Sequence, residues 1–128
     1  MVENMYNETV MNHFENPRNV GEMENSSAVG EVQSPSCGDT TIIYLDIDDN
    51  NVIRDIKFKT YGCAAAIASS SILTEMAKGK TLEEAMTIET QDIVDALGGI
   101  PEYKVHCSVL AADALKSAIA NYRKEQQK

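Results

Sequence analysis

Three cysteines and two residues beside them are the side chains of this chain whose types and spacing could do chemistry. Asp39 lies two residues after Cys37, Cys63 stands apart, and His106 directly precedes Cys107. Three thiolates with one imidazole or carboxylate would satisfy tetrahedral zinc or iron. An odd number of cysteines does not match a disulfide framework. We therefore interpret these residues as candidate ligands of one metal site. Because they include no C-x2-C pair, cysteines buried only for packing remain the alternative.

The local sequence around the cysteines favours reactive or metal-binding thiols. A glycine lies beside Cys37 and beside Cys63, and both Cys63 and Cys107 are predicted at the start of a helix. A helix N-terminus carries unpaired N–H groups and partial positive charge, which favour a thiolate over a thiol. A nucleophilic pair of Cys107 with His106 fits less well, because neighbours on a helix point about 100° apart.

Alternating apolar and polar residues predict the strands that must position these groups. Residues 40–48 and 52–60 both alternate, and the Asp- and Asn-rich stretch between them predicts a hairpin turn. Residues 29–33 could add a short edge strand. The acidic turn lacks the spaced ligands of an EF-hand, so we interpret it as a turn and not as a calcium loop.

Helical periodicity and capping signals predict the remaining elements. We expect helices over residues 2–15, 64–78, a short segment from 81, 87–97 and from 103 or 104 to about 124. The first half of the 64–78 helix consists almost entirely of alanine and serine, which would let another backbone approach closely. We assign His13, far in sequence from the cysteines, to packing or to the surface. The prediction is a single α+β domain over residues 1–128, with a small antiparallel sheet covered by helices.

Composition and charge exclude several classes of function. The formal net charge of −9 argues against a nucleic-acid partner, which would require an excess of Lys and Arg. The sequence contains no apolar run long enough to span a membrane, and its first residues lack the pattern of a signal peptide. We therefore expect a cytoplasmic protein without a membrane partner.

Six short motifs together resemble one known family, the IscU/NifU-type scaffolds for iron–sulfur cluster assembly. They occur in order over nearly the whole chain, as NPRNVG at 16–21, PSCGD at 35–39, FKTYGC at 58–63, AIASSS at 66–71, GKTLEEA at 79–85 and HCSVLA at 106–111. The resemblance implies the SufE/NifU-like fold with a three-stranded antiparallel sheet. It also implies a scaffold and not an enzyme.

The resemblance implies that the scaffold receives sulfur from a cysteine desulfurase, gathers iron, builds a [2Fe–2S] cluster and transfers it to apo-proteins. Cys37, Cys63 and Cys107 would then be cluster ligands and candidate persulfide acceptors. Such scaffolds also bind zinc in place of iron. The chain would act as a monomer or as a homo-oligomer linked by a shared cluster.

Three further residues take roles from the same resemblance. Asp39 would be a labile ligand or would tune cluster release, and His106 would be the alternative fourth ligand. Lys104 resembles the family lysine that helps to position the sulfur or the cysteine.

Two features of the sequence differ between scaffold relatives: the signal for a chaperone partner, and the pattern that distinguishes a sulfurtransferase branch. The family's Hsp70-type chaperone signal, LPPVK, is replaced by IPEYK at residues 100–104, so use of that chaperone stays open. The alternative is a zinc-dependent sulfurtransferase of the SufU type, a branch that has an insertion between the second and third cysteines and lacks the histidine before the last one. Because this chain has His106 and ordinary helices between Cys63 and Cys107, the scaffold is the favoured interpretation.

Overall fold

The structure is a computed structural model that describes residues 7–34 and 38–126, apart from the side chains of Tyr103 and Gln126. Its three strands, β1 (Ala28–Gln33), β2 (Thr40–Ile47) and β3 (Ile53–Tyr61), form one antiparallel sheet in the order β1-β2-β3. This confirms the predicted α+β fold with a small antiparallel sheet.

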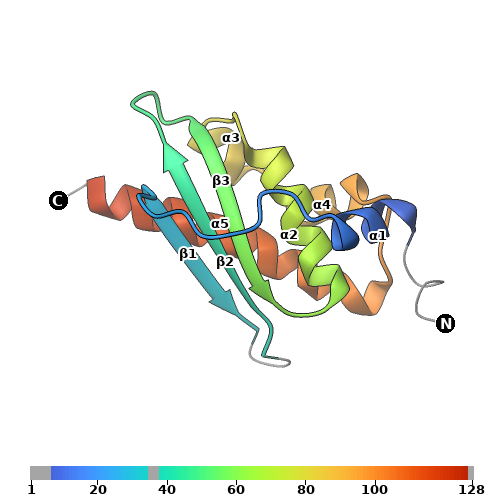
Figure 1. Ribbon diagram of the computed structural model, residues 1–128. Helices are drawn as coiled ribbons and strands as arrows, with labels where there is room; N and C mark the ends of the chain where they lie inside the picture. The colour runs from blue at the N-terminus through green and yellow to red at the C-terminus, as the bar shows by residue number, and fades with distance from the viewer. Residues whose placement is uncertain (1–6, 35–37, 127–128) are drawn as a thin grey trace.

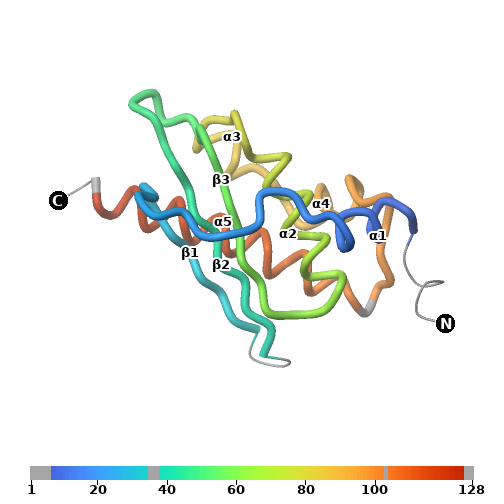
Figure 2. The backbone as a smooth tube through the Cα atoms, in the orientation of Figure 1, coloured from blue at the N-terminus to red at the C-terminus, as the bar shows by residue number. Residues whose placement is uncertain are grey.

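Helices cover one face of this sheet (Figure 1). The helical elements are α1 (Glu8–Glu15), α2 (Ala64–Ala77), α3 (Leu82–Met86), α4 (Thr90–Ala96), a 3-10 turn η2 (Glu102–Lys104) and α5 (Val105–Gln126). Helix α5 packs on β1 and β2, and α2 packs on β3 and on α5. The segment between α1 and β1 crosses the opposite face of the sheet, as the tube in Figure 2 shows.

The two long strands bury the side chains that the alternating pattern assigned to the core. Ile43 and Leu45 on β2 lie opposite Phe58 and Ile56 on β3, and all four are at most 1% exposed. Each fully buried side chain of this size stabilises the fold by about 1.5–3 kcal/mol. The sheet therefore presents an apolar face on which α2 and α5 can pack.

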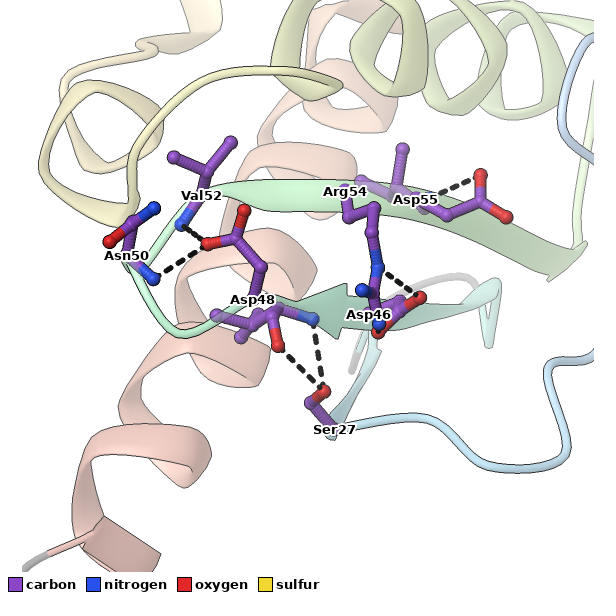
Figure 3. A network of polar contacts seen from close by, with 9 residues as sticks. Ser27, Asp46, Asp48, Asn50, Val52, Arg54 and Asp55 are labelled. Atoms are coloured by element: carbon purple, nitrogen blue, oxygen red, sulfur yellow. Dashed lines mark hydrogen bonds and ion pairs between the residues drawn. The ribbon is translucent and has the colours of Figure 1, made fainter.

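The predicted hairpin turn between β2 and β3 is confirmed, and the acidic residue at its start stabilises it (Figure 3). Asp48 Oδ1 accepts hydrogen bonds from the backbone N–H of Asn50 at 2.8 Å and of Val52 at 3.0 Å. Asn51 takes a φ of 60°, which asparagine tolerates better than most residues. The neighbouring pair Asp46 and Arg54 forms a two-pronged ion pair across the strands.

Helix α1 begins later than predicted. Asn7 has an extended backbone, and its side-chain oxygen accepts a hydrogen bond from Val10 N–H at 2.9 Å, so the helix begins at Glu8. The predicted start at residue 2 is wrong for this helix, and residues 1–6 lie outside the described part of the chain. The apolar periodicity of residues 2–15 does not reveal this cap, because asparagine is common both in caps and in surface positions.

Helix α4 is also shorter than predicted. The pattern indicated a start at residue 87, but Glu89 is the N-cap and exchanges reciprocal bonds with Asp92, so α4 begins at Thr90. The last helix begins at Val105, after η2, and continues to Gln126, slightly beyond the predicted end. Within the described residues, none of the helices combines the length and the apolar content that a membrane crossing needs.

His13 has the packing role that we predicted for it. It is 5% exposed, its Nδ1 lies 2.7 Å from Ser71 Oγ on α2, and its Nε2 lies 3.5 Å from Glu75 Oε1. Burial lowers the pKa of His13 below its usual value of 6.5, and the charge of Arg18 lowers it further, against the opposing charge of Glu75. The neutral imidazole thus links α1 to α2.

Stability should therefore fall as the solution becomes mildly acidic. Since the pKa of His13 is lower in the folded chain, the unfolded chain takes up the proton first, and the free energy of unfolding decreases as pH falls through the folded pKa. We expect His13→Asn, whose amide can keep the bond to Ser71, to lose less stability between about pH 7.5 and about pH 5.5. Urea unfolding at the two pH values measures this.

His106→Asn, made at an exposed position, is the matched control for this measurement. If it alters the pH dependence as much as His13→Asn does, the effect does not arise from the buried link between α1 and α2.

Candidate metal centre

The sheet register brings the first part of the site together. Thr40 at the start of β2 pairs with Tyr61 at the end of β3. Asp39 directly precedes the first of these residues, and Gly62 and Cys63 directly follow the second. Asp39 and Cys63 therefore meet at one end of the sheet, although they are far apart in sequence.

The packing of α2 against α5 brings Cys107 to the same place as Asp39 and Cys63. The first half of α2 buries small side chains, including Ala65, Ala68 and Ser69. Ser69 Oγ lies 2.9 Å from Ser108 Oγ on α5, and both side chains are fully buried. This close approach confirms the expectation from the alanine- and serine-rich sequence, and it places the residue after Cys107 against α2.

Three of the predicted site residues lie together as a result. Asp39, Cys63 and Cys107 each offer one ligand atom, and these atoms all lie within 4.8 Å of one another. The sulfur atoms of Cys63 and Cys107 are 3.4 Å apart. Cys107 is 1% exposed, whereas Cys63 and Asp39 are half-buried. One carboxylate and two sulfurs at this spacing could bind a borderline-soft metal ion.

The other predicted site residues lie beside this group or outside the described part of the chain. His106 is exposed, yet its Nε2 lies 3.6 Å from Cys107 Sγ, closer than the expected divergence of neighbours on a helix suggests. Lys104 is half-buried in η2, and its charge acts on Cys107. Cys37 lies outside the described residues.

The pKa of Cys107 is shifted upward, which is opposite to the shift that the sequence predicted. Burial first, and then the hydrogen bond and the charge of Cys63, together raise the pKa of Cys107 to about 12, against the opposing charge of Lys104. The prediction of a thiolate favoured by the helix start is therefore wrong for Cys107 in the polypeptide alone. Desolvation at a nearly inaccessible sulfur outweighs the partial charge of the helix terminus. A metal ion beside the sulfur would supply the positive charge that a thiolate needs.

No specific role was predicted from the sequence for two residues that shape this site. Ser108 anchors the first turn of α5 to α2, and Gly62 lies against the carboxylate of Asp39. Their sequence signal was a position directly beside a cysteine, within the FKTYGC and HCSVLA motifs.

Comparison with known proteins places these residues in a family context. The family model described as the NifU-like N terminal domain matches residues 5–128. A curated relative, the iron-sulfur cluster assembly scaffold protein IscU 1 of Archaeoglobus fulgidus, is 56% identical over 97% of this chain and 80% of its own length.

Solved structures show the same fold. The N-terminal part of a NifU-like protein from Brucella abortus superposes with a TM-score of 0.78 at 24% identity, over 97% of this chain and 98% of its own. A protein described as an iron-sulfur cluster assembly scaffold for the SUF system, from Fervidobacterium islandicum, gives a TM-score of 0.74 at 27% identity, over 93% of this chain and 99% of its own.

The effects of removing the Ser69 and Ser108 hydroxyls on the free energy of unfolding should be strongly coupled. Ser69→Ala or Ser108→Ala leaves the other hydroxyl buried without this partner, which costs about 1–3 kcal/mol of unfolding free energy. The double variant removes both groups and should lose clearly less than the sum of the two single losses. Urea unfolding of the four proteins measures the coupling.

Ser117→Ala, at a half-buried position on the same helix, controls for the general effect of replacing a serine in α5. Additive losses at Ser69 and Ser108 would show that the bond between them contributes little.

Proposed function

The chain belongs to the family of NifU-like N-terminal domains, and we propose that it is a scaffold on which an iron–sulfur cluster is assembled. The observation that carries this proposal is the convergence of Asp39, Cys63 and Cys107, whose ligand atoms lie within 4.8 Å of one another. The curated relative from Archaeoglobus fulgidus is named as such an assembly scaffold, which agrees with the expectation of a scaffold and not an enzyme.

The cargo is a [2Fe–2S] cluster, which needs four protein ligands. Cys63 and Cys107 supply two of them, and Cys37, two residues before Asp39 in sequence, supplies the third. The fourth position belongs to Asp39 or His106. The carboxylate already lies beside the two sulfurs, and the imidazole lies beside Cys107. Iron accepts both donors, but the hard oxygen binds it less tightly than a thiolate does.

The sulfur comes from the persulfide of a cysteine desulfurase. The thiolate of Cys107 attacks the terminal sulfur, a new S–S bond forms on Cys107, and the desulfurase cysteine leaves as its thiolate. The proton of Cys107 passes to solvent, and the charge of Lys104 stabilises the anion. Because Cys107 is 1% exposed, this step requires a local opening at the start of α5.

Release to apo iron–sulfur proteins takes place on the more exposed side of the site. Asp39 and Cys63 are half-buried and His106 is exposed, so a recipient protein can approach these ligands without unfolding the core. Zinc could occupy the same donors, because a carboxylate or imidazole with thiolates also suits its tetrahedral coordination.

A zinc-dependent sulfurtransferase is the second candidate function. It is kept because the protein from Fervidobacterium islandicum with the same fold bears the name SufU, although that protein is itself described as an assembly scaffold. In that case the site would hold zinc, and one thiol would accept and pass on sulfur without storing a cluster.

Anaerobic reconstitution tests the scaffold function. With ferrous iron, cysteine, a desulfurase and a thiol reductant that converts persulfide sulfur to sulfide, we expect the visible absorption of a [2Fe–2S] cluster in the wild-type protein. Cys107→Ser should lose nearly all of it, because one sulfur ligand is removed. Val109→Ala, at an exposed position in the same turn of α5, is the matched control and should retain the cluster.

If the wild-type protein binds zinc, accelerates desulfurase turnover and never develops cluster absorption, the sulfurtransferase is the correct function. A cluster retained in full by Cys107→Ser would remove this cysteine from the ligand set.

Asp39→Ala should lengthen the life of the assembled cluster. The substitution removes a hard oxygen ligand that exchanges readily, so we expect release to a recipient to slow about tenfold, or ~1.4 kcal/mol in the barrier. The decay of visible absorption during transfer to an apo-ferredoxin measures the rate. Asp113→Ala, at an exposed position on α5, is the control for loss of one negative charge. Equal decay in Asp39→Ala and wild type would show that Asp39 does not govern release.

A further inference from the structure

The carboxylate of Asp39 occupies space that any residue other than glycine would take at position 62. A Cβ atom built on Gly62 would lie 2.9 Å from both Cγ and Oδ2 of Asp39. It would also lie 3.1 Å from the Cβ of Ala66, in the first turn of α2. Cβ atoms essentially never lie within 3.0 Å of a heavy atom outside their own and neighbouring residues, so a side chain at position 62 would force a neighbour to move.

Backbone conformation does not explain this glycine. In the described part of the chain, the glycines with positive φ are Gly21, Gly38, Gly79, Gly98 and Gly99. Gly62 is not among them, so its backbone lies in a region that alanine also adopts. What the position requires is the absence of a side chain.

The neighbour that would move is Asp39. Its carboxylate is the end of a short side chain at a half-buried position just before β2, and rotation about its side-chain bonds can carry it away. Ala66 belongs to the packed and fully buried part of α2, and its Cβ contact at 3.1 Å needs only a small adjustment. An alanine at position 62 would therefore displace the carboxylate from its place within 4.8 Å of the two sulfurs.

We propose that Gly62 is a positioning residue for Asp39. The space left by its missing side chain keeps the carboxylate beside Cys63 and Cys107, and so decides whether the site has an exchangeable oxygen donor. The part of this inference that concerns cluster release rests on the proposed function. The part that concerns the geometry of the donor set does not. Gly62 thereby sets how readily the cargo leaves, without touching the cargo itself.

Binding of Co²⁺ alone tests the geometry independently of cluster assembly. Its visible spectrum reports the mixture of oxygen and sulfur donors around the ion. Gly62→Ala should change this spectrum and lower Co²⁺ affinity by the same factor as Asp39→Ala, within about twofold. In the Asp39→Ala background, Gly62→Ala should have no further effect, because the group on which it acts is already absent.

Ala66→Gly, added to Gly62→Ala, separates the two close contacts at this position. It removes the contact with α2 but leaves the one with Asp39, so the altered spectrum should persist. If Ala66→Gly restores the wild-type spectrum, Gly62 serves the packing of α2 and the inference is wrong. A wild-type spectrum in Gly62→Ala itself, or an undiminished effect of this substitution in the Asp39→Ala background, would overturn it as well.

Folding and cluster measurements complete the test. If Gly62→Ala fails to fold while the double variant with Asp39→Ala folds, the clash with the carboxylate is direct and the inference holds. Where the wild-type protein assembles a cluster, Gly62→Ala should slow its release about as much as Asp39→Ala does. Where the wild-type protein assembles none, the proposed function fails, and the Co²⁺ comparison still decides the role of Gly62.

Discussion

The direct contact between α5 and β1 is the constraint on which the rest of the structure depends. At Gly30 there is no room for a side chain, because a Cβ atom there would lie 2.3 Å from both Ala114 O and Ala118 N. Helix α5 can lie against the sheet at this distance because alanines face it. Large apolar residues of the same helix, among them Leu115 and Ile119, are at most 1% exposed and add about 1.5–3 kcal/mol each to stability. The axis of α5 is set by this contact, and with it the position of Cys107 at its first turn.

A second close contact, between α2 and α5, brings the cysteines of the candidate site together. Leucine or isoleucine in the first half of α2 would bury more apolar surface but would hold the two helices further apart. Alanine and serine let the start of α2 approach the start of α5 until the sulfurs of Cys63 and Cys107 are 3.4 Å apart. Buried serines then need hydrogen-bond partners, and Ser69 finds one in Ser108, directly after the cysteine. The same interaction therefore satisfies a buried hydroxyl and orients the first turn of α5.

The sequence predicts the elements well and the interactions between them only in part. Alternation predicted β2 and β3, because one face of each strand is buried and the other is not. The beginnings of α1 and α4 depend on the caps at Asn7 and Glu89, residues whose side chains serve equally well on a surface. The pKa of Cys107 could not be predicted, because its burial results from the meeting of three segments distant in sequence. The space at Gly62 is likewise visible only once strand register has brought Asp39 beside it.

Two of the candidate donors, Cys107 and Asp39, differ both in depth and in chemical hardness, and this bears on how the proposed scaffold could both hold and release its cargo. Cys107 is nearly inaccessible and offers a soft sulfur, which would hold iron or zinc tightly once its proton is lost. Asp39 is half-buried and offers a hard oxygen, which would exchange more readily as a ligand. Under the proposed function, a recipient protein that approaches from outside would meet Asp39 before it could reach Cys107. Ligand exchange would then begin at Asp39 while Cys107 still held the proposed cluster, so the cargo would not have to be free in solution at any stage of the transfer. This order depends on the contacts that bury Cys107 under α2, and those contacts depend on the close packing of α5 against the sheet.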